Sequence, residues 1–272
     1  MHASPCPRFR LLRIALIAVT LSITTDWVQA EEPLHQRIDR VFHETAIGPV
    51  AGSVDDLTFA RRVYLDTIGR IPSVAETRAV LADTSEDRRT RLVDQLLNSD
   101  DFPRHMATVF DVMLMERRGG KHIKSDEFRS WLQTSFEQNK PFNQLASELI
   151  AADTSKGKNP ATAFVLERDV EPNLLTREIG RMFLGMDLQC AQCHNHPNVA
   201  DYKQEDYFGV FAFMSRSSLL QPDKKKPAMI SEAADGQSPF KSVFTERESF
   251  TAPRVPGEVE ITEPVIAAGE EY

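Results

Sequence analysis

Amphipathic helical patterns follow one another from residue 34 to about residue 218. Apolar residues recur three or four positions apart in 34–46, 57–69 and 102–115, which places them on one face of an α-helix. After Leu219 this pattern stops, and prolines recur at positions 222, 227, 239, 253, 256 and 264. Proline interrupts a helix because it lacks a backbone N–H. The sequence therefore predicts a mainly α fold, with a multi-helix domain over residues 31–218 and an irregular or β-containing segment over residues 219–272.

Capping residues set the expected limits of individual helices. Ser73 with Glu76 has the spacing of a capping box, and Thr84 with Asp87 is expected to open the following helix. Ser125 is expected to cap a helix over 126–138. The other predictions are an exposed loop over 153–162, one helix over 174–188 and short strands at 243–244 and 259–261. The side chains expected in the core are Leu57, Val63, Leu92, Leu96, Trp131, Leu145, Ile179, Phe183, Phe208 and Phe211.

The composition is that of a globular protein, with 41% hydrophobic and 26% charged residues. The formal net charge is −8, which argues against a nucleic-acid partner because phosphate backbones bind basic surfaces. The basic run at 224–226 is short and lies in an expected loop. We find no glycine-rich phosphate loop and no serine nucleophile elbow, so the sequence predicts no enzyme class.

The first thirty residues have the pattern of a secretory leader. Arg8, Arg10 and Arg13 precede a short apolar run over 11–23, and residues 28–30 offer small side chains for cleavage. We expect residues 1–30 to be removed as a signal peptide and the remaining chain to be exported, to the periplasm or the extracellular space. The apolar run is short for a bilayer span and no second candidate follows it. No transmembrane span is therefore expected after signal removal, with a retained N-terminal anchor as the alternative.

One segment of the chain brings thiols and imidazoles together, namely Cys190-Ala191-Gln192-Cys193-His194 followed by Asn195-His196-Pro197. Two cysteines three positions apart, with a histidine directly after them, are typical of covalent haem c attachment. Thiols one helical turn apart can add to the two vinyl groups of a porphyrin, and the adjacent imidazole can bind the iron as proximal ligand. The segment therefore predicts a haem c site on Cys190, Cys193 and His194.

Two other uses of these side chains remain open. Cys190, Cys193, His194 and His196 form a full donor set for a structural zinc ion, although zinc sites usually draw their ligands from two separated segments. Because Cys6 leaves with the leader, the exported chain keeps a single cysteine pair. Such a pair tends to close as a disulfide in an oxidising compartment. Haem c, zinc and a local disulfide are thus three competing predictions.

A haem iron would also have a second axial position. His196 lies two residues after His194, and this short backbone link makes it a poor ligand for the opposite face of the same iron. We expect His196 to hydrogen-bond a haem propionate or the loop. The second axial position is expected to be vacant or to be filled by one of Met106, Met182, Met186, Met214, His105 and His122.

Several ordered blocks, spanning roughly residues 54–217, resemble a known family. The blocks are FARRVYLD at 59–66 with Gly69, Ile71-Pro72 and Glu76, RLVDQLL at 91–97, PFNQ at 141–144, FLGM at 183–186, CAQCHNHP at 190–197 and EDYFG at 205–209. They resemble the planctomycete cytochrome-like domain 2 family, secreted proteins with a domain of unknown function. Most members have aspartate where this chain has Asn195, and an aromatic residue where it has Asn198. Neither difference removes a thiol or His194.

The motif and the resemblance together predict an exported haem-c-type protein that transfers electrons or senses redox state. Its partner is expected to be a redox protein or a C-terminal domain of a longer protein. Members of the family are often fused to cytochrome c, sugar-binding or other extracytoplasmic modules, and we expect the chain to continue past Tyr272. The alternative function is a non-redox accessory or interaction domain of an extracytoplasmic polysaccharide-processing assembly, with the motif as a zinc site or a disulfide.

Overall fold

The computed structural model describes residues 32–49, 51–155, 157–223, 226–234, 236–245 and 248–262. The chain divides into two compact units, Met1–Ser53 and Val54–Tyr272. The signal peptide expected over residues 1–30 lies outside the described residues, as do positions 224 and 225 of the basic run. Across the part that is described, every helix is too short or too polar to cross a membrane.

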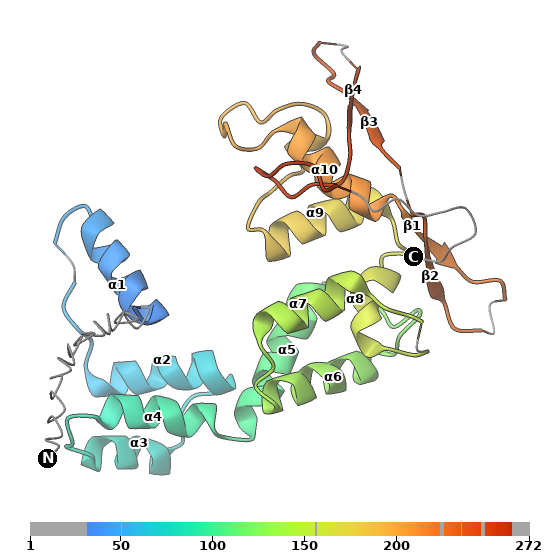
Figure 1. Cartoon of the computed structure of the whole chain (residues 1–272). Coiled ribbons are helices and arrows are strands. Elements are labelled where there is room, and N and C mark those ends of the chain that lie inside the picture. The colour runs from blue at the N-terminus through green and yellow to red at the C-terminus, as the bar shows by residue number, and fades with distance from the viewer. Residues whose placement is uncertain are drawn as a thin grey trace, which may run out of the picture. The chain divides into compact units, whose positions relative to one another are not determined.

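The described part of the first unit contains the amphipathic helix α1 (Leu34–Thr45) (Figure 1). Its limits agree with the helix predicted over 34–46 to within one residue. The apolar stripe of α1 consists of Leu34, Ile38, Val41 and Phe42, which are between 47% and 71% exposed. The periodicity of the sequence therefore predicts the helix, and its apolar face is open.

The second unit begins with α2 (Asp56–Ile68), α3 (Val74–Ala82) and α4 (Arg88–Leu97). Figure 1 shows these three helices together, and both α3 and α4 pack against α2. Apolar side chains between them form a small core because α2 and α4 each place one stripe inward. This small core consists of Ala60, Tyr64, Ile68, Leu92 and Leu96.

Local hydrogen bonds explain where these helices begin and end. The Asp55 carboxylate accepts a hydrogen bond from the Thr58 N–H at 2.9 Å and caps α2. The capping box predicted for Ser73 and Glu76 is confirmed at the start of α3. Gly69 ends α2 with a φ of 74°, in the left-handed region that glycine adopts without strain.

The main core involves α5 (Asp101–Met115), α6 (Ser125–Glu137), α7 (Phe142–Ala151), the 3-10 turn η1 (Pro160–Thr162), α8 (Ala163–Leu166) and α9 (Pro172–Phe183). α5 packs against α6, while η1 packs against α6 and α7. Fully buried side chains in this core include Leu114, Phe128, Leu132, Leu149, Phe164 and Leu175. The loop predicted over 153–162 is not exposed throughout, because η1 buries Ala161 and Thr162 against its neighbours.

Two consecutive charged residues are buried directly after α8. Glu167 accepts hydrogen bonds from the backbone N–H groups of residues 121–123, at 2.8, 2.6 and 2.9 Å. Arg168 donates hydrogen bonds to the backbone carbonyls of Phe164 at 2.7 Å and Leu114 at 2.6 Å. These bonds satisfy backbone groups that the helices leave without a partner. They connect the end of α5, the loop before α6 and α8.

The C-terminal part consists of α10 (Gln204–Met214) and two antiparallel hairpins (Figure 1). β1 (Ser217–Leu220) pairs with β2 (Met229–Glu232), and β3 (Ser238–Lys241) pairs with β4 (Glu248–Thr251). β3 and β4 also pack against α10. The predicted β content is thus confirmed.

The positions predicted for the strands were wrong. Residues 243–244 form a turn directly after β3, and residues 259–261 are outside any strand. The prediction relied on apolar and β-branched composition. Strand formation depends on a pairing partner, which composition does not specify.

Several predicted helix limits were also wrong. Thr84 with Asp87 does not open the helix, because α4 begins at Arg88 and has no side-chain cap. Asp83 forms the local turn before it by accepting from the Ser85 N–H at 3.0 Å. Ser125 is the first residue of α6 and does not cap it. A polar residue near a helix start is therefore a weaker signal than the complete capping box of α3.

The predicted core residues fall into three groups. Burial of Leu92, Leu96, Leu145 and Ile179 is confirmed. Five other side chains are only partly buried and pack against the edges of the cores, namely Val63, Trp131, Phe183, Phe208 and Phe211. Leu57 is 43% exposed, although it lies on the same face of α2 as Ala60, Tyr64 and Ile68, because it stands in the first turn at the end of this buried stripe.

Candidate functional site

The cysteine motif lies in a 3-10 turn, η2 (Cys190–Gln192), and not on a continuous helix. α9 ends at Phe183, and the chain then turns at Gly185, which has a φ of 66°. The Met186 N–H donates a hydrogen bond back to the Gly180 carbonyl at 2.8 Å. A Cβ at Gly180 would lie 3.0 Å from the Met186 oxygen, so glycine permits this close return. The helix predicted over 174–188 is therefore wrong for residues 184–188.

Both thiols of the motif are free and exposed. The Cys193 N–H donates a hydrogen bond to the Cys190 carbonyl at 3.2 Å, and residues three apart in a 3-10 turn lie above one another. Ala191, between them, is fully buried and packs with Leu188 and Tyr207. The turn is thus anchored through Ala191, while both sulfur atoms remain accessible to a reactant.

His194 is half-buried, and its hydrogen bond defines which ring nitrogen carries a hydrogen. Nδ1 lies 2.8 Å from the Asn195 carbonyl oxygen. Because a carbonyl can only accept, Nδ1 is the donor, and in the neutral ring the lone pair is on Nε2. The ring also packs against Phe244, with the ring centroids 4.9 Å apart. His194 therefore presents Nε2 as an available ligand atom on an oriented ring.

His196 has the opposite arrangement. Its Nδ1 accepts hydrogen bonds from the backbone N–H groups of Asn198 at 3.2 Å and Val199 at 3.0 Å. In the neutral ring the hydrogen is therefore on Nε2, and neither nitrogen offers a free lone pair. The His196 N–H also donates to the Tyr202 carbonyl at 2.8 Å. The side chain thus shapes the turn over residues 196–202, which agrees with the loop contact predicted for it.

The alternative zinc set is not assembled in the structure. Within the described ranges, no three or more His, Cys, Asp or Glu side chains lie close enough together to hold a metal ion. A histidine that binds zinc must supply the lone pair of a ring nitrogen. His196 instead uses its Nδ1 lone pair to accept hydrogen bonds from two backbone N–H groups. Zinc binding through His196 would therefore require the turn over 196–199 to open.

Side chains from α9 and α10 hold the motif in place. Asn173 Oδ1 accepts hydrogen bonds from Gln192 Nε2 at 3.1 Å and from the Tyr207 hydroxyl at 2.9 Å. Gln204 Nε2 donates to the Gln192 carbonyl at 3.3 Å. Tyr207 is fully buried, and burial raises the pKa of its hydroxyl above the ordinary value, so this group remains a donor.

The sequence analysis did not identify these supporting residues. Tyr207 belongs to one of the blocks that carry the family resemblance, so a signal for it was present. Asn173 and Gln204 lie 19 and 12 residues from Gln192, the residue that each of them contacts. No local pattern relates positions at these separations, because the return of the chain after α9 creates the contacts.

The segment after β3 completes the site. The Val243 N–H donates a hydrogen bond to the Cys193 carbonyl at 3.1 Å, and Gln204 Nε2 donates to the Lys241 carbonyl at 3.0 Å. Phe244 packs on the imidazole of His194. Residues 241–244, which belong to the segment predicted as a linker or the start of a further domain, therefore contact the motif directly.

Of the residues predicted as a second axial ligand, Met186 lies in the cluster beside the motif, with Leu188, Ala191 and Tyr207. Met182 and Met214 pack against the main core. The His122 Nε2 lies 3.1 Å from the Asp169 carboxylate, His105 lies close to Gly69 at the end of α2, and Met106 is half-buried on α5. Among these candidates, Met186 is therefore the one that packs in the cluster containing Ala191 of the motif.

Asn195 gives a first testable prediction. Its Oδ1 accepts a hydrogen bond from the Gln204 N–H at 2.8 Å, in the first turn of α10. Asn195→Ala should lower the free energy of unfolding by about 1 kcal/mol, as expected for a lost helix cap. Asn195→Asp should stay within about 0.5 kcal/mol of the original chain, because a carboxylate accepts the same bond at a helix N-terminus.

Urea unfolding of these variants measures the predicted difference. Asn198→Ala is the matched control, because its side chain is exposed in the same loop and makes no described hydrogen bond. If Asn195→Ala were as stable as Asn198→Ala, the Asn195 side chain would not support α10.

The comparisons with known proteins address the whole helical part. A protein-family model matches residues 33–218, and its description is PSCyt2, a protein of unknown function (DUF1549). No curated protein and no solved structure matches the chain. The matched range includes α1 to α10 and the cysteine motif, and it confirms the resemblance that the ordered sequence blocks indicated. The chain therefore belongs to the PSCyt2 family, whose function is unknown.

Proposed function

We propose that the chain is an exported haem-c-type protein or domain that transfers electrons or senses redox state for an attached or partner module. The observation that carries this proposal is the state of His194. Its Nδ1 donates to a backbone carbonyl at 2.8 Å, which leaves the Nε2 lone pair available on the residue that follows Cys193 in the chain. The Cys190 and Cys193 thiols are both free and exposed. The cytochrome-like name of the family is consistent with this assignment.

The donor set fits a covalently attached haem. Cys190 and Cys193 would hold the porphyrin as thioethers, and His194 Nε2 would bind the iron. When bound, the haem iron supplies one-electron oxidation and reduction. Thioether formation would also remove two exposed thiols that an oxidising compartment would otherwise attack.

The chain itself would orient the proximal imidazole. Donation from Nδ1 to the Asn195 carbonyl fixes the tautomer and the orientation of the ring. Phe244 restricts rotation of the ring through the contact between the two rings. The backbone bond from Val243 to Cys193 holds this aromatic side chain close to the motif. Asn195, Val243 and Phe244 would therefore orient the imidazole that holds the haem iron.

Export forms part of the proposal. Its support is the leader pattern over residues 1–30, since the cysteine pair would meet haem and its attachment machinery after crossing the membrane. The predicted periplasmic or extracellular location follows from the same pattern. A redox partner, or a further domain of a longer protein, would receive or supply the electron.

The visible spectrum and intact mass of the mature protein test the proposal. The protein is exported in a host that matures c-type cytochromes, and Cys190→Ala/Cys193→Ala is the matched control. A reduced α-band of c type together with the added mass of one haem is the expected result, and both should be absent from the control. A colourless protein of unmodified mass would overturn the haem assignment.

The second candidate function is an accessory or interaction domain in which the motif acts as a structural staple. The observation that favours it is that the motif backbone accepts hydrogen bonds from α10 and from the segment after β3. If the first experiment yields an unmodified protein, metal analysis and thiol counting of that sample distinguish zinc from a disulfide.

A further inference from the structure

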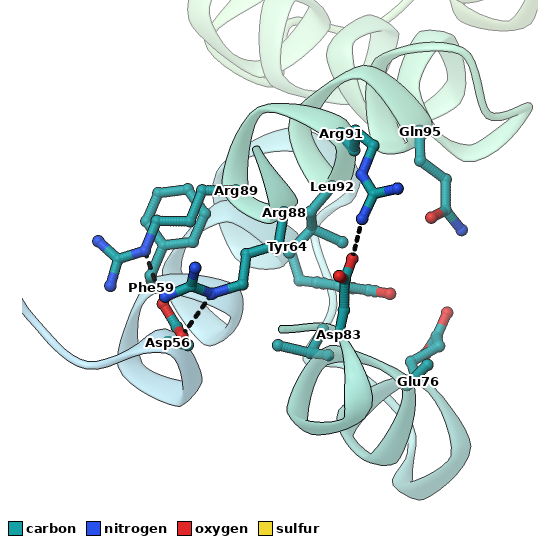
Figure 2. Close-up of a pocket in the computed structure, with 12 residues that line it drawn as sticks. Asp56, Phe59, Tyr64, Glu76, Asp83, Arg88, Arg89, Arg91, Leu92 and Gln95 are labelled. Atoms are coloured by element: carbon teal, nitrogen blue, oxygen red, sulfur yellow. Dashed lines mark hydrogen bonds and ion pairs between the residues drawn. The ribbon is translucent and has the colours of Figure 1, made fainter. Parts of the chain in front are cut away.

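A second candidate site lies between α2, α3 and α4 and includes none of the motif residues. It is a cavity of about 320 Å³, a volume at the lower end of the range for small-molecule sites. Figure 2 shows its lining, which combines an apolar floor with charged side chains at two ends. The two ends differ in charge, and this difference indicates the kind of ligand that the cavity would accept.

The floor of the cavity is apolar and preformed. Tyr64 and Leu92 are only 2% and 9% exposed and belong to the small core. Phe59 and Val80 pack against the same core. The Arg89 guanidinium lies 4.8 Å from the centroid of the Phe59 ring, which restricts both side chains. An apolar body, aromatic or aliphatic, would bury its surface here without reorganising the walls.

One end of the cavity carries an excess positive charge. Arg88 Nε and Arg89 Nε bind the two oxygens of the single Asp56 carboxylate, at 2.8 and 2.7 Å (Figure 2). These two guanidinium groups lower the pKa of the Asp56 carboxyl below its ordinary value. Asp56 is therefore charged at neutral pH, and two cations opposite one anion leave a net charge of about +1.

The two arginines are also held with unused donors. Arg88 Nη1 donates to the Ser85 carbonyl at 2.9 Å, and Arg89 Nη2 donates to the Val54 carbonyl at 2.6 Å. Among the described residues, Arg88 Nη2 and Arg89 Nη1 have no hydrogen-bond acceptor. This end is thus preorganised for one more anion.

The other end of the cavity has no excess cation. Arg91 lies 2.5 Å from Asp83 and 3.4 Å from Asp87, so two carboxylates meet one guanidinium. Glu76 is paired with Arg70 at 2.8 Å. A second negative charge on the ligand would meet repulsion here. Gln95, which Figure 2 shows above Glu76, offers a neutral amide instead.

From these observations we propose that the cavity binds a small monocarboxylate with an apolar body. The carboxylate pairs with the free N–H groups of Arg88 and Arg89, and the body lies over Phe59, Tyr64 and Leu92. Planar carboxylates suit two guanidinium donors, and a single negative charge matches the residual charge of that end. This site is independent of the haem proposal, because its residues and its ligand differ from those of the motif.

Benzoate is the probe that tests the site, with benzamide as its neutral isostere. Both are titrated into the full exported chain, and amide chemical shifts in ¹H–¹⁵N spectra are followed. Benzoate should bind saturably with a Kd below about 5 mM and at least about ten-fold more tightly than benzamide. Absence of saturation by about 5 mM, or equal binding of the two probes, would overturn the proposal.

Two pairs of variants locate the binding. Arg89→Gln should weaken benzoate about ten-fold, whereas Arg104→Gln should not change it, because Arg104 is an exposed arginine on α5 paired with Asp101. Ala79→Phe should block the cavity that Ala79 lines, whereas Ala75→Phe, exposed on the same helix, should not. Ala79→Phe alters no arginine, so it remains informative if Arg89→Gln unfolds. Unchanged benzoate binding in Ala79→Phe would exclude this cavity.

Discussion

On the proposed haem c assignment, His194→Ala is expected to abolish the c-type spectrum of the protein exported in a host that matures c-type cytochromes. The reason lies in the tautomer of the ring, since donation from Nδ1 to the Asn195 carbonyl leaves Nε2 as the available ligand atom of the motif. Reduced and oxidised visible spectra of the purified variant measure the effect. Far-ultraviolet circular dichroism of the same sample establishes that the helices are retained.

His196→Ala is the matched comparison, because the two histidines belong to the same loop. Its Nδ1 accepts two backbone N–H groups, so this variant should keep the spectrum and lose about 1 kcal/mol of stability through the weakened turn. His43→Ala, on the exposed face of α1, should change neither quantity. A normal spectrum in His194→Ala, or a lost spectrum in His196→Ala, would contradict the assigned tautomers.

The helical part of the fold was predictable because its signals are local. Periodicity alone gave α1 and α2 to within one residue, and the Ser73–Glu76 pair gave the start of α3. The limit of α9 failed because the chain reverses there. α9 stops at Phe183 because Gly180 and Gly185 allow the chain to turn back toward the helix. The apolar residues after Phe183 extend the helical periodicity of the sequence, although the backbone there is not helical.

The chemistry of the motif was predictable in its residues but not in its surroundings. Spacing alone identified Cys190, Cys193 and His194 as one group. It did not indicate that Asn173 and Gln204 hold Gln192, or that Phe244 packs on His194. It also could not distinguish the two histidines, because a tautomer depends on hydrogen bonds of the folded loop. Sequence therefore supplies the donors, and the fold determines which of them are available.

The same limit applies to charges in the core. Nothing in the sequence around Arg168 distinguishes it from an exposed arginine, yet its side chain is fully buried. Its guanidinium lies 4.3 Å from the centroid of the Phe164 ring and 3.7 Å from the Glu178 carboxylate. Burial lowers its pKa to about 10, and Glu178 opposes that shift. The side chain is thus charged at neutral pH inside the main core.

Arg168→Ala is expected to lower the free energy of unfolding by about 3–5 kcal/mol. The variant removes the donors to the Phe164 and Leu114 carbonyls, and these groups would remain buried without a partner. It also opens a cavity against the Phe164 ring, which adds to the loss. Urea unfolding followed by circular dichroism measures the change, and a large shift of the midpoint without a change of slope is the expected result.

Arg181→Ala is the matched control, because Arg181 pairs with the same Glu178 at 2.7 Å while its side chain is 52% exposed. An exposed pair of this kind contributes at most about 1 kcal/mol. Arg168→Met separates the effect of the lost hydrogen bonds from the effect of the lost volume. The methionine side chain fills much of the same space but cannot donate to the Phe164 and Leu114 carbonyls. If Arg168→Ala cost no more than Arg181→Ala, the guanidinium would not be what joins α5 to α8. If Arg168→Met equalled the original chain, packing against Phe164 and not the two carbonyl bonds would account for the loss in Arg168→Ala.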